Sequence, residues 1–297
     1  MSSAFDARFP NTKALVNITT TEAPVPSLPK AEIPDILEIS ASLKRATLQE
    51  HPDYNLVATD ADVANLVESL ENVPADSPPS LFVDLEGVNL SRHGSVSLLQ
   101  IFALPQKKTH LIDIHTLKGK AFTKSSVTGT TLKDILESPS ITKVFFDVRN
   151  DSDALYSHFG IKLAGVQDLQ LMELATRTFS RRCVNGLARC IENDCPMTAA
   201  ERRSWKTTKQ KGLDLFAPER GGTYEVFNLR PLADEIIQYC IEDVRLLPRL
   251  WEKYDRKITL RWRAKIKLEA ENRVRESQSS TFNGKGKHMA LAPSGWS

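Results

Sequence analysis

The chain has 297 residues, of which 41% are hydrophobic and 26% are charged, an ordinary composition for a globular protein. Its formal net charge of +2 excludes a polycation, so a nucleic-acid partner would have to be held by a local basic patch. No apolar run approaches the roughly 20 residues that span a bilayer, and the first residues lack the apolar segment of a secretory signal. We therefore expect an intracellular protein, nuclear or cytoplasmic, with no membrane partner.

The two ends of the chain differ from its middle. Residues 1–55 contain several prolines and show little hydrophobic periodicity, which predicts a mostly disordered tail. We expect one domain over residues 56–258. A basic helical extension and a disordered C-terminal tail are predicted to follow over residues 259–297. Both tails are candidate contact points for protein partners.

The predicted elements begin with a helix in TDADVANLVESLENV, where a cap residue precedes apolar residues at helical spacing. The runs SLFVDLEGVNL, SVSLLQIFAL and THLIDIHTL predict three successive strands, which we expect to be antiparallel. After a short helix in TLKDILESPS, the run ITKVFFDV predicts a fourth strand. Further helices are predicted in DSDALYSHFGI, VQDLQLMELATRTF, VNGLARCIEND and one long segment from about Arg230. This order predicts an α/β fold with a mixed sheet flanked by helices.

Two acidic residues interrupt the first of these strands. Because side chains alternate along a strand, Asp84 and Glu86 point to the same face of the sheet. Burying two unpaired like charges costs on the order of several kcal/mol each, so a cation is expected beside them. Lys, Arg or a metal ion would serve, and the alternative is that the pair lies at an exposed strand end.

Further carboxylates follow in two places. Asp147, Asp151 and Asp153 lie where the fourth strand gives way to a helix, and each could simply match the positive end of the helix dipole. In the segment QYCIEDV, Tyr239 and Asp243 are four residues apart and so share one helical face, although such a pair is often only a packed ring beside a carboxylate. Together these groups form an unusual supply of hard oxygen ligands, which suit Mg²⁺ or Mn²⁺ rather than zinc.

Taken in chain order, these groups resemble the motifs of a known family. Asp84-x-Glu86 in a first strand, an aspartate at a strand-to-helix junction and Tyr239-x-x-x-Asp243 in a late helix are similar to the three motifs of the DEDD 3′-5′ exonucleases. The tyrosine places the resemblance in the tyrosine subclass, like ribonuclease D. It covers about residues 57–255.

The same resemblance indicates which aspartate belongs to the second motif. Asp151 is favoured, because the residues four and nine positions after it are leucine and glycine, as in the family. The family commonly has Asn or His near the position of Asp147, so whether Asp147 joins the metal shell stays open. Segments such as HLIDI and LFAPERGGTYEVFNLRPL also resemble the Exd1-type exonuclease-domain-containing proteins, particularly the fungal ones.

The resemblance implies a ribonuclease-H-like fold and two divalent ions, Mg²⁺ or Mn²⁺, about 3.5–4 Å apart, that clamp a phosphodiester. Asp84 would bridge both ions, Glu86 and Asp243 would hold the ion that binds the attacking water, and Tyr239 would orient that water. Asp151 would help to hold the leaving-group ion, largely through water. The implied activity is a metal-dependent 3′-5′ exonuclease that releases nucleoside 5′-monophosphates from single-stranded nucleic acid.

Strand contacts are predicted in AAERRSWKTTKQK, where basic side chains surround a tryptophan that could stack on a base. The alternative is a solvated insertion whose tryptophan packs inward. Between positions 253 and 275, nine Lys or Arg and three Asp or Glu either extend the strand path or form a solvated cationic face. The residues assigned to nucleic-acid contacts are Arg202, Arg203, Trp205, Lys206 and Lys209.

Two hypotheses of different classes follow. The first is the exonuclease, with RNA favoured over DNA as the substrate. The second is a non-catalytic RNA-binding adaptor built on the same fold, because some Exd1-type relatives lack the acidic set. All four acids and the tyrosine are present in this chain, so the enzyme is the preferred hypothesis.

Overall fold

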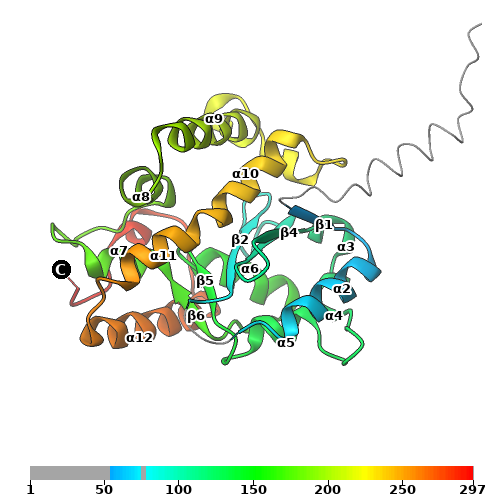
Figure 1. Cartoon of the computed structure of the whole chain (residues 1–297), viewed down its shortest axis with the longest axis horizontal. Coiled ribbons are helices and arrows are strands. Elements are labelled where there is room, and N and C mark those ends of the chain that lie inside the picture. Colours follow the sequence, from blue (N-terminus) through cyan, green and yellow to red (C-terminus); the bar gives the residue numbers. More distant parts are fainter. Residues whose placement is uncertain (1–53, 75–77, 297) are drawn as a thin grey trace, which may run out of the picture. The chain divides into compact units, whose positions relative to one another are not determined.

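The computed structural model describes residues 54–74 and 78–296 (Figure 1). Within them, six strands form one mixed sheet in the order β1-β4-β3-β2-β5-β6, with helices on both faces, which confirms the predicted α/β class. Apart from Tyr54 and Asn55, the predicted N-terminal tail lies outside the described residues. The strands are Tyr54–Val57 (β1), Leu81–Glu86 (β2), Leu98–Ala103 (β3), Lys108–Ile112 (β4), Lys143–Phe145 (β5) and Val166–Asp168 (β6).

The centre of the sheet is an antiparallel meander. β2, β3 and β4 pair antiparallel as predicted, whereas β1 joins β4, β5 joins β2 and β6 joins β5 in parallel. Sequence analysis missed β1, which crosses the predicted boundary between tail and domain, and β6, which was assigned to the following helix. Strands of four and three residues are too short to carry a clear alternating pattern.

Helices surround this sheet. The prediction of one long helix from about Arg230 is wrong, because three helices occupy that stretch. Pro248, in the first turn of the second of these helices, cannot donate a backbone hydrogen bond to the preceding turn. Thr259 then caps the third, its hydroxyl accepting from the amide of Trp262. The α-helices are Asp60–Glu71 (α2), Ile114–Leu117 (α3), Lys120–Thr123 (α4), Leu132–Glu137 (α5), Arg149–Phe159 (α6), Leu169–Thr176 (α7), Leu187–Asp194 (α8), Ala199–Phe216 (α9), Asp234–Arg245 (α10), Leu247–Asp255 (α11) and Leu260–Ser277 (α12), and the 3₁₀ helices are Pro218–Arg220 (η1), Tyr224–Asn228 (η2) and Lys287–Ala290 (η3).

Apolar side chains cover both faces of the sheet and leave the end of β2 polar. Leu81, Val83 and Leu85 pack on one face with α2, α5 and α6, while Phe82 packs on the other with α7 and α11. Since side chains alternate along β2, Asp84 shares the Phe82 face. α10 packs across this face against β2 and β3 (Figure 1).

The C-terminal stretch differs from the predicted disordered tail. After α12, residues 278–296 fold back on the domain, where the amide of Val184 donates to the carbonyl of Ala290. The ring of Trp296 is buried, with its centroid 5.0 Å from that of Trp262. These partners are distant in the chain, so no local pattern in the sequence announces them. Among the described residues, no helix is both long and apolar enough to cross a bilayer.

Candidate active site

The first two carboxylates lie at the C-terminal end of β2, in the interior of the sheet. Asp84 is opposite Gln100 of β3, and Glu86 is opposite Leu98. β2 has β3 on one side and β5 on the other, so neither acid lies on an edge strand. Both residues are half-buried. The structure therefore favours an enclosed pair over a fully exposed strand end.

α10 brings the tyrosine and a third carboxylate to this point. Tyr239 and Asp243 are buried on the helical face that packs on β2 and β3. One carboxylate oxygen from each of Asp84, Glu86 and Asp243 can be chosen so that all three atoms lie within 4.8 Å of one another. Three acids that are separated by up to 159 positions in the chain thus converge on one small volume, where a metal ion would fit.

The fourth acid comes from α6, which directly follows β5. Because β5 runs parallel to β2, the start of α6 lies at the same end of the sheet as Glu86. Asp151 is buried there. Burial raises the pKa of Asp151 well above its ordinary value, and the negative charge of Asp84 raises it further. The structure therefore brings three of the predicted acids within 4.8 Å of one another and places Asp151 at the same end of the sheet, near enough for its charge to act on Asp84 and Glu86.

The pKa values show that this group has too little positive charge around it. Burial raises the pKa of Asp84 to about 7, with a further contribution from the charge of Asp243. Burial and the charge of Asp84 also raise the pKa of Glu86 well above its ordinary value. The nearby ammonium of Lys209 opposes both shifts without reversing them. An additional cation would stabilise the ionised cluster.

Lys209 enters the cluster from α9. Its Nζ donates to Oδ1 and Oδ2 of Asp243 at 2.9 and 2.8 Å and to the hydroxyl of Tyr239 at 2.7 Å. Sequence analysis assigned this lysine to strand contacts on the surface, whereas its side chain is only 16% exposed. No local pattern distinguishes it from the other basic residues of α9.

A glycine lets α9 approach the tyrosine. A Cβ atom at Gly212 would lie 2.4 Å from Cδ2 of Tyr239, which is far inside van der Waals contact. Phe216, one helical turn further along α9, meets the same ring edge-on at 5.0 Å between centroids. The position of Tyr239 thus depends on α9, and sequence analysis missed both supporting residues.

The other aspartates near α6 are already paired. Asp147 accepts two hydrogen bonds at 2.6 Å from Arg149, and Asp153 accepts one at 2.6 Å from Arg92. Asp151 has no ion pair with any described residue. The arginine bonds lower the pKa of Asp147 although burial opposes them. Asp147 therefore belongs to a separate, charge-balanced cluster with Asp168, Arg149 and Arg273.

The remaining residues predicted to contact a strand differ in their exposure and partners. Trp205 is only 5% exposed and packs in the apolar cluster that includes Cys195 and Leu250, so the prediction that its ring stacks on a base is wrong. Lys206 pairs with Glu192 at 2.5 Å. The guanidinium of Arg202 donates to the backbone carbonyl of Glu192, and Arg203 is exposed.

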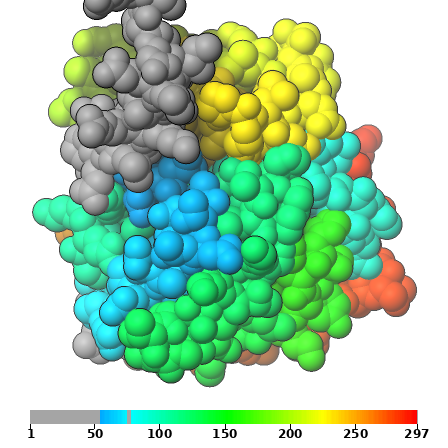
Figure 2. Space-filling view, turned by 90° about the vertical axis from the view of Figure 1, so that its right-hand side faces the viewer, coloured from blue at the N-terminus to red at the C-terminus, as the bar shows by residue number. Residues whose placement is uncertain are grey.

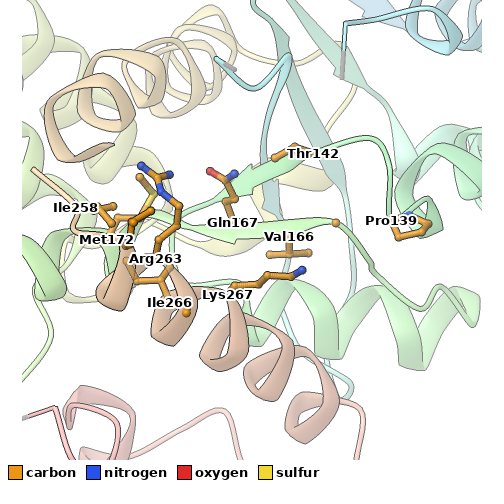
Figure 3. A pocket seen from close by; sticks show the side chains of 12 residues that line it. Pro139, Thr142, Val166, Gln167, Met172, Ile258, Arg263, Ile266 and Lys267 are labelled. Carbon is orange, nitrogen blue, oxygen red and sulfur yellow. The ribbon is translucent and has the colours of Figure 1, made fainter. Parts of the chain in front are cut away.

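A pocket of about 520 Å³ lies elsewhere, between the β6 edge of the sheet and α12 (Figure 3). Val166 and Gln167 line it from β6, and Arg263 and Lys267 line it from α12. None of the four clustered acids is among its lining residues. The carboxylate cluster therefore lies outside this pocket.

Comparison with known proteins agrees with this geometry. A family model described as 3′-5′ exonuclease matches residues 54–259, which is more than two thirds of the chain. The chain belongs to this 3′-5′ exonuclease family. The matched range starts with β1 and ends just before α12, so it contains every strand and all four clustered acids of the exonuclease domain.

Curated relatives of this exonuclease-family chain are similar over part of their length. "piRNA biogenesis protein EXD1" of Mus musculus is 28% identical over 176 residues, which are 59% of this chain and 28% of the relative. The Homo sapiens protein of the same name is 35% identical over 111 residues, 37% of this chain and 20% of the relative. The chain therefore matches less than a third of the length of either relative.

Solved structures share the fold of this exonuclease domain. Trypanosoma brucei RNase D in complex with GMP has a TM-score of 0.63 at 22% identity, with 82% of this chain and 70% of that chain covered. RNase D of Escherichia coli has a TM-score of 0.51 at 22% identity, with 77% and 52% covered. These likenesses confirm the predicted ribonuclease-H-like fold.

Proposed function

We propose that this chain is a metal-dependent 3′-5′ exonuclease that hydrolyses single-stranded nucleic acid, preferably RNA, and releases nucleoside 5′-monophosphates. The observation that carries the proposal is the convergence of four carboxylates from β2, α6 and α10 at one end of the sheet. Such a cluster is costly to bury, because like charges repel and few water molecules solvate them. A bound cation would offset this repulsion and would give the buried carboxylates a function.

The donor set fits divalent ions that prefer oxygen ligands. Carboxylate oxygens of Asp84, Glu86 and Asp243 lie within 4.8 Å of one another, and Asp151 adds a fourth acid beside Asp84. No thiol or imidazole belongs to this set, which favours Mg²⁺ or Mn²⁺ over zinc. When bound there, such ions would polarise the phosphodiester and lower the pKa of a water molecule.

Tyr239 is suited to orient the attacking water. Its hydroxyl oxygen accepts from Lys209, and its proton is donated toward the carboxylate of Asp243, so the hydroxyl is held beside a proposed metal ligand. Contacts with Phe216 and Gly212 fix the ring, so that the hydroxyl has one position relative to Asp243. We assign to Tyr239 the positioning of the water, which reduces the entropy cost of the attack.

Lys209 supplies positive charge where the substrate brings negative charge. Its ammonium lies beside Asp243 and 4.0 Å from the centroid of the Tyr239 ring. A phosphate of the strand would find this cation next to the reacting centre. Arg203 and Lys206, further toward the start of α9, would extend the basic path along the same helix.

The preference for RNA is supported by the names of related proteins. One solved neighbour is Trypanosoma brucei RNase D in complex with the RNA U12, at a TM-score of 0.63, 21% identity and coverage of 86% of this chain and 81% of that chain. The curated relatives are named for piRNA biogenesis. Both descriptions concern RNA, so we carry that substrate class to this chain.

The test is a time course on 5′-labelled single-stranded RNA and DNA with Mg²⁺ or Mn²⁺, in which wild type is compared with Asp243→Ala and Glu235→Ala. Glu235 is exposed in the first turn of α10, so its variant is a matched control. We expect a ladder that shortens from the 3′ end for wild type and the control and that is absent for Asp243→Ala. Equal ladders from wild type and Asp243→Ala would reject the proposed site.

A second function is favoured by one observation. The Lys209 ammonium already bonds Asp243 and Tyr239, as in a site that needs no metal ion. The corresponding hypothesis is a non-catalytic RNA-binding adaptor. In the same assay, intact substrate together with salt-sensitive binding would select the adaptor over the enzyme.

A further inference from the structure

The backbone after α12 follows the first turns of α6, the helix that carries Asp151. We name residues 278–291 the C-terminal strap. The side-chain amide of Gln278 lies 3.4 Å from the hydroxyl of Ser152, and the guanidinium of Arg149 donates to the carbonyl of Met289 at 2.8 Å. The strap therefore meets residues on both sides of Asp151 in the sequence.

Arg92 and Gly284 hold the strap on α6. Arg92 bonds Asp153 of α6 at 2.6 Å and also donates to the carbonyl oxygens of Ser277 and Ser279, each at 2.8 Å. A Cβ atom at Gly284 would lie 2.1 Å from Oδ1 of Asn150, so the backbone of the strap lies directly against this side chain. The strap thus passes in close contact with the residue that immediately precedes Asp151.

The charge of the strap is entirely positive. Glu276 is the last acidic residue of the chain, and Lys285, Lys287 and His288 follow it. All three are exposed, and no ion pair joins either lysine to another described residue. Folding therefore does not explain these two lysines, whose charges are available to an anionic partner.

The strap lies against a different part of the site from α9. α9 reaches the cluster at Asp243 of α10 through Lys209, whereas the strap borders Asp151 of α6. Turquoise and red residues, which are far apart in the chain, both appear at the right-hand edge of Figure 2, and Arg92 joins the two segments through its bond to Ser279. The four acids thus have basic segments on both their α10 side and their α6 side.

We propose that the C-terminal strap is a wall of the substrate path, in which Lys285 and Lys287 contact phosphates of the single strand whose 3′ end enters the carboxylate cluster. This inference rests on the proposed nuclease function for the direction of the strand. Phosphate is the appropriate partner because the strap offers two unpaired ammonium groups and no acid. The partly exposed ring of Phe282, 5.8 Å from the guanidinium of Arg92, adds a face on which a base can stack.

The test compares two double charge reversals in the full chain. K285E/K287E changes the strap, and the control K107E/K108E changes two lysines at the β3–β4 turn, which lies at the end of the sheet opposite Glu86. Binding of fluorescein-labelled oligouridine without divalent metal is measured by anisotropy over a range of salt concentrations. We expect the strap variant to bind roughly ten-fold more weakly and its salt-dependence slope to fall by about 1.4, as for two lost phosphate contacts. Equal affinities and slopes in the two variants would overturn the proposal.

A small substrate separates this proposal from the nuclease function. The p-nitrophenyl ester of thymidine 5′-monophosphate has no flanking phosphates to reach the strap, so K285E/K287E should hydrolyse it with Mn²⁺ at the wild-type rate. If wild type does not hydrolyse this ester or RNA, the nuclease function fails, while the anisotropy comparison still decides whether the strap binds RNA. A loss of ester hydrolysis confined to K285E/K287E would show that the strap supports the site structurally, and it would overturn the phosphate-contact role.

Discussion

Two carboxylate clusters at the same end of the sheet differ in their balance of charge. In the first, the ammonium of Lys209 pairs with Asp243 and acts on Asp84 and Glu86, while Asp151 has no ion pair with any described residue. In the second, two aspartates meet two guanidinium groups: Asp147 with Arg149, and Asp168 with Arg273 at 2.7 Å.

The pKa values follow this difference in balance. Burial raises the pKa of Asp84 to about 7, whereas Arg149 lowers the pKa of Asp147 although burial acts in the opposite direction. The balanced cluster is complete as it stands and joins β6, α6, α12 and the turn between β5 and α6. The unbalanced cluster still needs positive charge, and for this reason we assign function to it and structure to the other.

The largest expected effect separates activity from stability in the unbalanced cluster. Asp84→Asn removes a proposed metal ligand and should lower the rate of nucleotide release at least about a thousand-fold. The same change removes a repelling charge, so the melting temperature should stay equal or rise. Nucleotide release and thermal unfolding are measured on the same sample. A variant that loses activity only because it unfolds would contradict this account.

The balanced cluster should respond in the opposite way. Asp168→Asn removes the partner of Arg273, whose side chain is 4% exposed, and it weakens an acceptor for the amides of Asp147 and Val148. We expect unfolding in urea to require about 3–5 kcal/mol less free energy, because a buried charge is left without its partner. An unchanged unfolding midpoint would show that this cluster is not the structural counterpart we describe.

A smaller effect is expected at the edge of the unbalanced cluster. Tyr239→Phe removes the hydroxyl that bonds Lys209 but keeps the ring packed on Phe216. The turnover rate should fall roughly ten- to hundred-fold while RNA affinity is retained. The matched control is Tyr224→Phe, whose ring also packs on Phe216. Equal turnover in the two variants would refute the orienting role of Tyr239.

The smallest effect lies at a lone basic group outside both clusters. Burial and the charge of Lys108 lower the pKa of His110 to about 4. As the pH falls, His110 is therefore protonated near pH 6.5 in the unfolded chain but only near pH 4 in the folded chain. Because protonation then favours the unfolded chain, the protein should lose stability as the pH falls from 6.5 toward 4. At pH 5 the loss is about 2 kcal/mol. Urea unfolding at pH 7 and pH 5 should show a smaller difference for His110→Gln than for wild type.

Sequence patterns predicted the parts of the molecule that depend on nearby residues. The alternation in LFVDLEGV predicted β2 and its shared acidic face, and the spacing in QYCIEDV placed Tyr239 beside Asp243 on one helix face. Residue spacing does not predict that the acids of β2 lie near those of α6 and α10. That expectation rested on the resemblance to a family. In the folded chain, Asp84 and Glu86 of β2 lie close to Asp243 of α10.

Features that depend on distant partners were not predicted. Lys209 resembles its basic neighbours until α9 packs on α10, and Gly212 matters only because the Tyr239 ring lies against it. The C-terminal strap contains few apolar residues and was predicted to be disordered, yet it is held by bonds to Arg92 and Arg149. Trp205 stood among basic residues and was assigned to a strand path, whereas the core buries its ring.

Binding of Mn²⁺ tests most directly whether the unbalanced cluster is a metal site. Electron paramagnetic resonance can follow a titration of the metal-free protein, with Asp243→Asn beside the exposed control Glu235→Gln on the same helix. We expect saturable binding by wild type and the control, and an affinity at least about ten-fold lower in Asp243→Asn. Equal Mn²⁺ affinities in all three proteins would contradict this expectation.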